Sequence, residues 1–598
     1  MELKFNDNYA KVYGDKYTDK MNYLAKVIME YETGEDNFNV FNFEAGLGKS
    51  LTVNKVLLEC VFDWDIKKKF LIVKRFNEES LKSLDFIDGG FVQNSIAITH
   101  ENWKDWQYKL EDLQSQKIIF ISHQRYISLC ENDELREAFT KKRDVLIIDE
   151  KVNFPVYTYN DFRYTNIFSI LPDGLRESLM KVCKPLNEFI ERQKTLKNTN
   201  KVFTHKFKIH PATLRNFTNE IQVALDNNTI SNLDERTTIT NFVNELQLFY
   251  SSQCIYNSGN ISTHNPKHKH WGLNNNIILD ASAGIDGVYS CNPPKFYLIN
   301  QSRIVDHSQC KFNIIKFNSS KTKVNTYSEQ YFSEMAQRII ENKKDNDKVL
   351  VVGHKDFAEK IHEQLILLHD ENDIWIDKRD KKNDKDYGDQ SIAISWYGNL
   401  IGKNWAENFT QVWLISTPNI SIEQYLIHYL HYSDKEIGNK STEIIKGRYK
   451  NTMFNDIQRG YIASEMYQSL KRIQRVAIPK GEFFITCEDE EVINMILSQF
   501  KNATVTNEIE LDFVKQLQEE KEKQKELRKQ ERHENRKPDQ VDLFIEHIMT
   551  LKKGKYKKSD IASELSITKL NRVLTDVRTK SLLNVKLKIH TREIEVIR

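Results

Sequence analysis

Short runs of apolar, often β-branched residues recur along the chain, and polar or helical stretches separate them. In the N-terminal part these runs are FNVFNF (38–43), FLIV (70–73), IAI (96–98), KIIFI (117–121) and VLII (145–148). The same alternation returns further along in NIIKF (313–317), KVLVV (348–352), SIAIS (391–395) and QVWLIS (411–416). Strands that alternate with helices are typical of βαβ units and a parallel sheet. The pattern therefore predicts an α/β fold with two domains, each built on a parallel sheet.

Three other segments break this alternation. Residues 151–270 are mostly polar, with few runs that could be buried strands, so we expect a helical insertion there. Residues 515–537 carry dense mixed charge and are followed by Pro538, which predicts a solvated helix that acts as a semi-rigid spacer. The exposed face of a longer helix is the alternative. Residues 539–598 remain as a small terminal module.

Length and composition limit the class of protein. A chain of 598 residues is too long for one core and suggests roughly three to five domains. Seven cysteines lie far apart, none in a CxxC pair, which predicts neither a disulfide framework nor a zinc or iron–sulfur site. The chain shows no signal peptide and no run of about 18 apolar residues, so we expect a cytoplasmic protein without a membrane partner.

The charges nearly cancel overall but not locally. The chain has 87 Lys and Arg against 85 Asp and Glu, a net charge of +2. Residues 551–598 hold 13 of the basic and only 5 of the acidic residues, a net +8, which leaves −6 for residues 1–550. A local excess of basic residues is typical of nucleic-acid binding. We therefore expect the terminal module to bind nucleic acid.

The strongest local signal is a glycine-rich turn between a predicted strand and a predicted helix. It runs Glu44-Ala45-Gly46-Leu47-Gly48-Lys49-Ser50-Leu51. Glycines let backbone N–H groups curl around phosphate oxygens, and the helix N-terminus adds its positive dipole end. Lys49 would reach the β- and γ-phosphates of a nucleotide, and the Ser50 hydroxyl would hold Mg²⁺. Phe43 stands where the usual P-loop has its first glycine.

Two carboxylates, Asp149 and Glu150, end the predicted strand at 145–148. The carboxyl ends of parallel strands form the edge at which α/β proteins bind ligands. Asp149 would hold Mg²⁺ through its water shell, and Glu150 would orient and deprotonate an attacking water. A strand end with two merely exposed acids is the plainer alternative.

A third candidate segment, Gln468-Ser469-Leu470-Lys471-Arg472-Ile473-Gln474-Arg475, lies far downstream. Arg472 and Arg475 are three residues apart and share one face of a predicted helix. Brought across a cleft, they could neutralise charge on a transferring γ-phosphoryl group as arginine fingers. A solvated or salt-bridged helix face is the alternative.

Over residues 35–480 the order of these motifs resembles that of the superfamily 2 helicases, the DEAD/DEAH-box-like group. The resemblance implies two RecA-like P-loop domains, with ATP and Mg²⁺ in the cleft between them and nucleic acid across their top. It places the first domain at 1–150 plus 271–310, the second at 311–510, and a charged linker at 511–538. Asp280-Ala281-Ser282-Ala283 resembles the motif that links hydrolysis to the grip on nucleic acid, and Gln468 is expected to contact the nucleotide or a coupling residue.

The resemblance also implies nucleic-acid contacts. The residues at matching positions are Lys74, Arg75, Ser122, His123, Arg125, Gly402 and Asn404. The acid motif reads Asp-Glu-Lys-Val instead of DEAD or DEAH, and no adenine-reading glutamine precedes the glycine-rich turn, so unwinding, polarity and the choice between DNA and RNA stay open. Some DNA helicases of this group carry a strand-guiding insertion where residues 151–270 lie, and we interpret its histidine-rich end, 264–271, as a phosphate-contacting loop.

The terminal module has the order of a winged helix-turn-helix. A helix at 541–551 is followed by helices at 558–565 and 568–579, and two alternating runs, VKLKIH and REIEVI, would form a β-wing. Lys569 and Arg572 open the candidate recognition helix. Modules of this size also dock proteins, so a protein partner is the alternative to DNA.

The leading hypothesis is a nucleic-acid-stimulated ATPase that acts as a helicase or translocase, with DNA favoured over RNA by the terminal module. One rival is the motor subunit of a restriction or anti-phage defence complex, which moves on duplex without unwinding it. Another is an ATP-gated DNA-binding protein that serves replication or regulation of a plasmid or phage.

Overall fold

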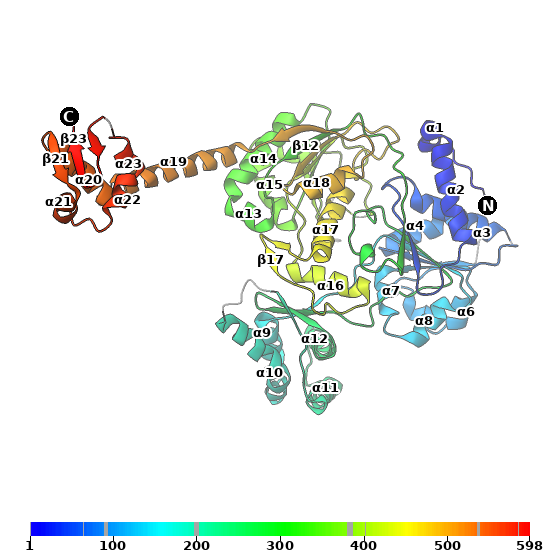
Figure 1. Ribbon diagram of the computed structural model, residues 1–598. Helices are drawn as coiled ribbons and strands as arrows, with labels where there is room; N and C mark the ends of the chain where they lie inside the picture. Colours follow the sequence, from blue (N-terminus) through cyan, green and yellow to red (C-terminus); the bar gives the residue numbers. More distant parts are fainter. Residues whose placement is uncertain are drawn as a thin grey trace. The chain divides into compact units, whose positions relative to one another are not determined.

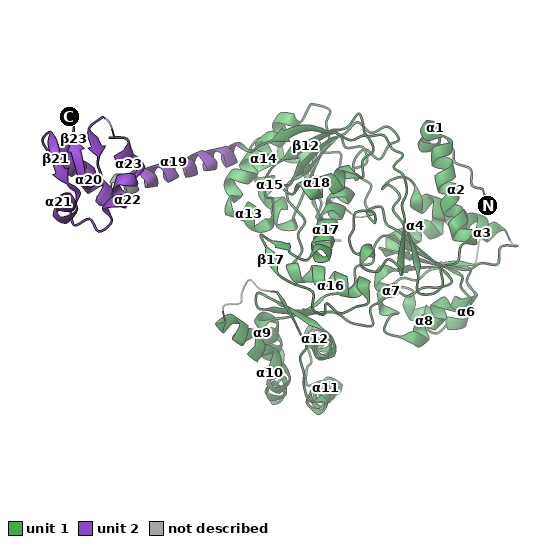
Figure 2. Ribbon diagram, in the orientation of Figure 1, with its two compact units in different colours: residues 1–511 green, residues 512–598 purple. Residues whose placement is uncertain are grey.

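A computed structural model describes all residues except 1, 64, 89–93, 197–201, 379–386, 401, 535–538, 584 and 598. The described residues form two compact units, Met1–Leu511 and Asp512–Arg598 (Figure 2). Each unit has a hydrophobic core of its own.

The first domain of unit 1 holds the blue and cyan helices α1–α4 and α6–α8 of Figure 1. It is built on a parallel sheet of seven strands in the order β11-β1-β10-β5-β2-β4-β3. The strands are β1 (Phe38–Phe41), β2 (Phe70–Lys74), β3 (Ser95–Ala97), β4 (Ile118–Ser122), β5 (Val145–Asp149), β10 (Asn275–Leu279) and β11 (Phe296–Ile299). Every neighbouring pair is parallel, and β1 and β2 are buried along their whole length. The five apolar runs of the N-terminal part thus form the sheet that their pattern predicted.

The second domain repeats this design with seven parallel strands in the order β14-β15-β13-β16-β19-β12-β20. The strands are β12 (Lys311–Ile315), β13 (Val349–Gly353), β14 (Ile374–Ile376), β15 (Ile392–Trp396), β16 (Gln411–Leu414), β19 (Glu482–Thr486) and β20 (Val505–Ile509). The prediction of an α/β fold with two parallel sheets is confirmed. Strands β14, β19 and β20 were not recognised in the sequence. Strands β14 and β20 lie at the two edges of the sheet, where the apolar pattern is weak, whereas β19 is a mostly buried interior strand.

Helices flank both sheets. In the first domain they are α1 (Asn8–Tyr13), α2 (Asp15–Glu30), α3 (Lys49–Phe62), α4 (Asn77–Asp88), α5 (Trp103–Trp106), α6 (Leu110–Ser115), α7 (His123–Ser128) and α8 (Asp133–Thr140). In the second they are α13 (Lys321–Thr326), α14 (Ser328–Asn342), α15 (Ala358–Leu365), α16 (Ile422–Ser433), α17 (Thr452–Leu470) and α18 (Glu490–Leu497).

Helix α16 belongs to the second domain by sequence, but it packs on the first. Tyr425, Leu426 and Tyr429 join the same buried cluster as Phe38, on strand β1. The hydroxyl of Tyr432 donates to the carbonyl oxygen of Val152 at 3.0 Å. The two domains therefore share a core, which fixes the cleft between them.

The insertion holds helices α9 (Asp161–Ile170), α10 (Asp173–Thr195), α11 (Pro211–Asp226) and α12 (Leu233–Ser251). It also holds a four-stranded antiparallel sheet, β6-β9-β8-β7, of strands β6 (Tyr157–Tyr159), β7 (Phe203–His205), β8 (Cys254–Asn257) and β9 (Asn260–Thr263). The insertion is thus mostly helical, as expected, but it also carries a small sheet that the sequence did not indicate. These strands are three or four residues long, too short to give a legible alternation.

The histidine-rich end of the insertion is not a solvated loop. His268 and His270 are only 3% and 4% exposed, and the ring of His270 packs edge-on against Phe154 at 5.0 Å between centroids. The ring of His431, on α16, stacks on the same Phe154 at 4.9 Å. Residues 268 and 270 thus help to join the insertion to both domains, whereas Lys267 and Lys269 are exposed, so a phosphate contact at this end stays a prediction.

Unit 2 begins with helix α19 (Asp512–Glu534), which coincides with the expected spacer; the predicted stop at Pro538 lies outside the described residues. The module that follows contains α20 (Gln540–Thr550), β21 (Gly554–Lys557), α21 (Lys558–Glu564), α22 (Leu570–Thr575), α23 (Val577–Lys580), β22 (Leu587–Ile589) and β23 (Glu593–Val596). Its three strands pair in the order β21-β23-β22. The expected single helix at 568–579 is two short ones, because Asp576 ends the first and caps the second.

Within the described part of the chain, no helix is both long and apolar enough to cross a membrane.

Candidate active site

A cavity of about 320 Å³ lies between the two domains of unit 1. It opens where strands β1, β5 and β10 end, because the carboxyl ends of parallel strands meet at one edge of the sheet. Its lining residues come from six separate segments: Ala45, Gly46, Gly48, Lys49, Ser50, Leu51, Glu79, Asp149, Glu150, Asp280, Ala281, Gly402, Asn404, Gln468, Arg472 and Arg475. All six residues expected to act in catalysis line this cavity.

The glycine-rich turn is closed on both sides. Gly46 and Gly48 have φ angles of +82° and +89°, a left-handed backbone that glycine adopts without steric cost. A Cβ on Gly48 would lie 3.2 Å from the hydroxyl of Tyr17, on α2, and one on Gly46 would lie 3.4 Å from Cγ of Arg475, in the second domain. Helix α3 begins directly after Gly48, so its N-terminal N–H groups face the cavity.

Lys49 lies inside this turn, where its Nζ donates to the carbonyl oxygen of Phe43 at 3.3 Å. Burial lowers the pKa of Lys49, and the Asp149 carboxylate opposes this shift. From this position the Lys49 ammonium group can contact a phosphate that is bound in the turn.

The Asp149 carboxylate accepts hydrogen bonds from two side chains. Ser50 Oγ donates to Asp149 Oδ2 at 2.9 Å, and Lys74 Nζ donates to the same oxygen at 2.6 Å. Burial by itself would raise the pKa of Asp149, but the ammonium groups of Lys74 and Lys49 outweigh it and hold this pKa below its ordinary value. The carboxylate is therefore ionised at neutral pH.

Glu150 is held in an uncommon backbone conformation, with φ at +70°. Its N–H donates to Leu279 O at 3.0 Å, and His123 Nε2 lies 2.9 Å from the carbonyl oxygen of Asp149, which fixes the peptide on the other side. Strain of this kind persists where the surroundings over-determine it, as at active sites. The Glu150 side chain points to Arg75, whose Nη1 lies 3.5 Å from Glu150 Oε2.

The arginines lie just beyond helix α17, which ends at Leu470, so they do not share the helical face that the sequence predicted. Arg475 donates from Nη1 to Asn404 Oδ1 at 2.6 Å and from Nε to Lys471 O at 2.8 Å. Arg472 is 6% exposed, and its Nε has no hydrogen-bond partner among the described residues. Burial, together with the neighbouring Arg475, lowers the pKa of Arg472 to about 9. Both groups are therefore charged at neutral pH, and Arg472 has a donor to spare for an anion.

Gln468, one turn before Arg472, donates from Nε2 to Ser282 Oγ at 3.4 Å. Ser282 in turn donates to Asp280 Oδ1 at 2.7 Å, and Tyr289 donates to the other oxygen of Asp280 at 2.9 Å. This contact ties the end of α17 to the segment after β10, and the coupling role expected of Gln468 stays a prediction.

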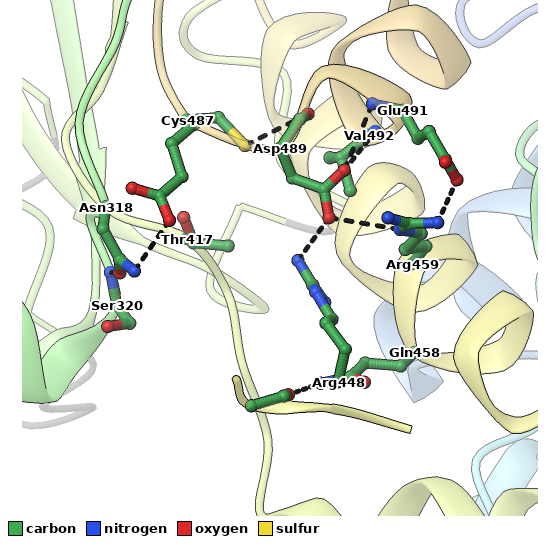
Figure 3. A network of polar contacts seen from close by, with 12 residues as sticks. Asn318, Ser320, Thr417, Arg448, Gln458, Arg459, Cys487, Asp489, Glu491 and Val492 are labelled. Carbon is green, nitrogen blue, oxygen red and sulfur yellow. Dashed lines mark hydrogen bonds and ion pairs between the residues drawn. The ribbon is translucent and has the colours of Figure 1, made fainter. Parts of the chain in front are cut away.

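Ion pairs on one side and a close backbone approach on the other fix the position of α17. Arg459 pairs with both Asp489 and Glu491, and Arg448 Nη2 lies 2.8 Å from Asp489 Oδ2 (Figure 3). On its other side α17 approaches the first domain so closely that a Cβ on Gly460 would lie 2.5 Å from the backbone nitrogen of Gly287. The place of the arginines is therefore set by both domains.

Several expected roles do not fit the place of the residue. Glu44 is buried and accepts backbone N–H groups of residues 304 and 305, and Leu47 lies in the hydrophobic core, so neither side chain reaches the cavity. Lys74 is 3% exposed and bound to Asp149, which leaves it no surface for a nucleic-acid strand. His123 is buried as well, and burial lowers its pKa to about 4.

The other expected nucleic-acid contacts are spread over three places. Ser122 caps helix α7 by accepting from Arg125 N at 3.2 Å, and the guanidinium of Arg125 lies 4.1 Å from the centre of the Trp103 ring. Gly402 and Asn404 line the cavity itself. The last two, Lys569 and Arg572, are exposed in unit 2.

Glu79 is the cavity residue that the sequence did not indicate. It lies on α4, and its Oε1 would lie 2.8 Å from a Cβ on Gly402, so the two domains touch there. Burial raises the pKa of Glu79, and Glu150 adds to the shift. Arg75, four residues earlier, lies before α4 begins, so no helical pair in the sequence could have indicated Glu79.

Ser50 and Asp149 fit a magnesium ion. A hydroxyl and an ionised carboxylate 2.9 Å apart at the edge of the cavity are hard oxygen donors of the kind that Mg²⁺ prefers, with substrate phosphates and water as its other ligands. Among the described residues, no group of three or more His, Cys, Asp or Glu side chains could hold a metal ion by itself. A magnesium ion at this site would therefore need phosphate and water as further ligands.

No protein-family model and no curated protein matches the chain. Among solved structures, one titled XPD_APO is 13% identical with a TM-score of 0.51 and covers 82% of this chain and 100% of its own. A structure of S. tokodaii Xpd4 is 13% identical with a TM-score of 0.49, over 81% of this chain and 99% of its own. The likeness to the structure titled XPD_APO shows that this chain shares the fold of that structure, which here consists of two parallel sheets with a cavity between them.

Proposed function

We propose that the chain is an ATP-dependent nucleic-acid motor, a helicase or translocase, that hydrolyses ATP between its two RecA-like domains. One observation carries the proposal: three distant segments, the glycine-rich turn, the acid pair and the arginine-bearing helix end, line a single cavity. A phosphate-binding turn on one domain that faces arginines on the other suits phosphoryl transfer coupled to domain movement.

The first domain would bind the nucleotide and activate the attacking water. The N–H groups at the start of α3 and the Lys49 ammonium would bind phosphate oxygens. Ser50 and Asp149 would hold Mg²⁺, which neutralises phosphate charge when bound. Glu150 would orient the attacking water and accept its proton.

The second domain would complete the site. Arg472 and Arg475 would stabilise the charge that develops on the transferred phosphoryl group. Through its hydrogen bond to Ser282, Gln468 would connect the site of phosphoryl transfer with the segment after β10. Hydrolysis would then change how the two domains meet.

DNA is the preferred nucleic acid in this proposal. Its support is the terminal module, where Lys569 and Arg572 are exposed in a segment of net charge +8. A protein partner that docks on this module is the alternative.

Lys49→Ala tests the proposal. ATP turnover would be measured with single-stranded DNA, duplex DNA, RNA or no nucleic acid. We expect stimulation by nucleic acid in the native chain and no turnover in the variant, because a neutral side chain cannot bind the phosphates. Lys55→Ala, on the same helix but beside Phe5, is the matched control and should keep the native rate. Undiminished turnover by Lys49→Ala would refute the mechanism.

An ATP-gated DNA-binding protein for replication or regulation of a plasmid or phage is the second candidate. The observation that favours it is that residues 512–598 form a separate compact unit. A sequence-specific footprint of the whole chain that needs ATP but not its hydrolysis would support it. Strand displacement would argue for a helicase, and ATP-driven movement on duplex without displacement for a motor subunit of a restriction or defence complex.

A further inference from the structure

Arg75 lies next to Glu150, the carboxylate that orients the attacking water in the proposed mechanism. Its Nη1 lies 3.5 Å from Glu150 Oε2, and this buried oxygen accepts no hydrogen bond within the described part of the chain. A carboxylate that is to orient water has to offer an oxygen to it. In this structure one oxygen of Glu150 is directed at a guanidinium instead.

The pair is placed where it can be broken. The side chains of Arg75 and Glu150 are 23% and 33% exposed, and 3.5 Å is longer than a charge-assisted hydrogen bond. A partly exposed ion pair of this length contributes at most about 1 kcal/mol. A phosphate group can bind a guanidinium through two parallel hydrogen bonds, which is a stronger contact.

The residues around Arg75 have partners of their own. Lys74, its neighbour, is buried on Asp149, and Arg472, just beyond α17, lines the same cavity as Glu150. The departure of Arg75 would therefore leave Glu150 next to a cation that belongs to the site. The carboxylate would turn toward the cavity and not out of it.

We propose that Arg75 is a positioning residue that couples nucleic-acid binding to hydrolysis. Without nucleic acid its guanidinium holds Glu150, and a phosphate of the bound strand takes the guanidinium and frees Glu150 for the attacking water. The inference rests on the proposed function, and it explains how an occupied nucleic-acid site would raise the rate of ATP hydrolysis.

The first test is the ATPase rate of Arg75→Ala without nucleic acid. We expect this rate to rise about fivefold, the factor that corresponds to a pair of about 1 kcal/mol, and stimulation by nucleic acid to shrink accordingly. If Arg75 only contacted nucleic acid, its replacement would leave the unstimulated rate unchanged. A higher concentration of nucleic acid would then restore the stimulated rate. Arg136→Ala, which removes another partly exposed ion pair of the same domain, with Asp133, is the control and should change neither rate.

The second test needs no turnover. Binding and release are linked, so Glu150→Gln should tighten the binding of a labelled oligonucleotide without ATP by about the same factor. Glu79→Gln removes a neighbouring carboxylate that is not paired with Arg75 and measures the general effect of one lost negative charge. In the Arg75→Ala background the effect of Glu150→Gln should fall to that general level, because the pair is already absent.

The outcomes separate the two proposals. A native chain without ATP turnover under any condition overturns the proposed function. A native chain that is stimulated normally, with an unchanged or lower unstimulated rate in Arg75→Ala, overturns the coupling role alone. Additive effects of Arg75→Ala and Glu150→Gln on oligonucleotide binding overturn it as well.

Discussion

Replacing Gly460 by alanine should slow ATP hydrolysis although Gly460 touches neither the cavity nor any expected ligand. The residue lies in the middle of α17, and a Cβ there would meet Gly287 N at 2.5 Å and Ile285 O at 2.6 Å. Real Cβ atoms do not come within 3.0 Å of other heavy atoms, and both obstacles are backbone. The helix therefore has to move away from the first domain, by roughly 0.5–1 Å.

Two energies oppose each other in this variant. Alanine stabilises a helix interior by about 1 kcal/mol relative to glycine. Overpacking against rigid backbone costs about 1–3 kcal/mol. The net loss of stability is therefore small, and the folded state survives. The rate suffers more, because Arg472 and Arg475 follow the same helix, and a displacement of about 1 Å of positioned groups can cost about 100-fold.

The assay is kcat of nucleic-acid-stimulated ATP hydrolysis, measured beside nucleotide affinity and thermal unfolding. Gly174→Ala is the matched control, because Gly174 also lies in a helix, α10, and a Cβ there would meet nothing within 4 Å. We expect the control to keep its kcat and to gain some stability. A native kcat in Gly460→Ala would show that the approach of α17 to the first domain does not position the arginines, and would refute the reasoning.

Three further predictions follow from the site and the terminal module. Arg475→Ala should lower kcat roughly 1000-fold while nucleotide affinity changes little, since an arginine finger acts on the transition state; an equal change in both would contradict this role. Burial lowers the pKa of Lys471 to about 8 from 10.5, so the folded chain binds fewer protons than the unfolded chain between these values. Stability to urea should therefore rise as the pH increases from about 8 to 10.5, and Lys471→Met should flatten the rise. The double variant Lys569→Ala and Arg572→Ala should weaken DNA binding and reduce the slope of log affinity against log salt by about 1.8; an unchanged slope would favour protein docking by this module.

Local patterns were sufficient for nine of the fourteen described strands in the two large sheets and for most of the cavity. Buried parallel strands read as continuous apolar runs, so strands such as β1, β2 and β5 could be placed to within two residues. The glycine-rich turn and the acid pair are legible because their chemistry is carried by adjacent residues. The short strands of the insertion and the break at Asp576 were not legible, since neither leaves a periodic signal.

The sequence by itself determined which residue types could bind phosphate, metal and water, because these demands are met within one turn or one strand end. Only the tertiary structure decided which partner each charged residue takes. Lys74 and Arg75 stand side by side in the sequence as equal candidates for a nucleic-acid contact, yet one is buried on Asp149 and the other reaches Glu150 at the cavity edge. Likewise Glu79 and Gly460 gain their roles from contacts across the cleft. Pairing energies depend on distance and burial, and both are set by packing between segments that are far apart in the chain.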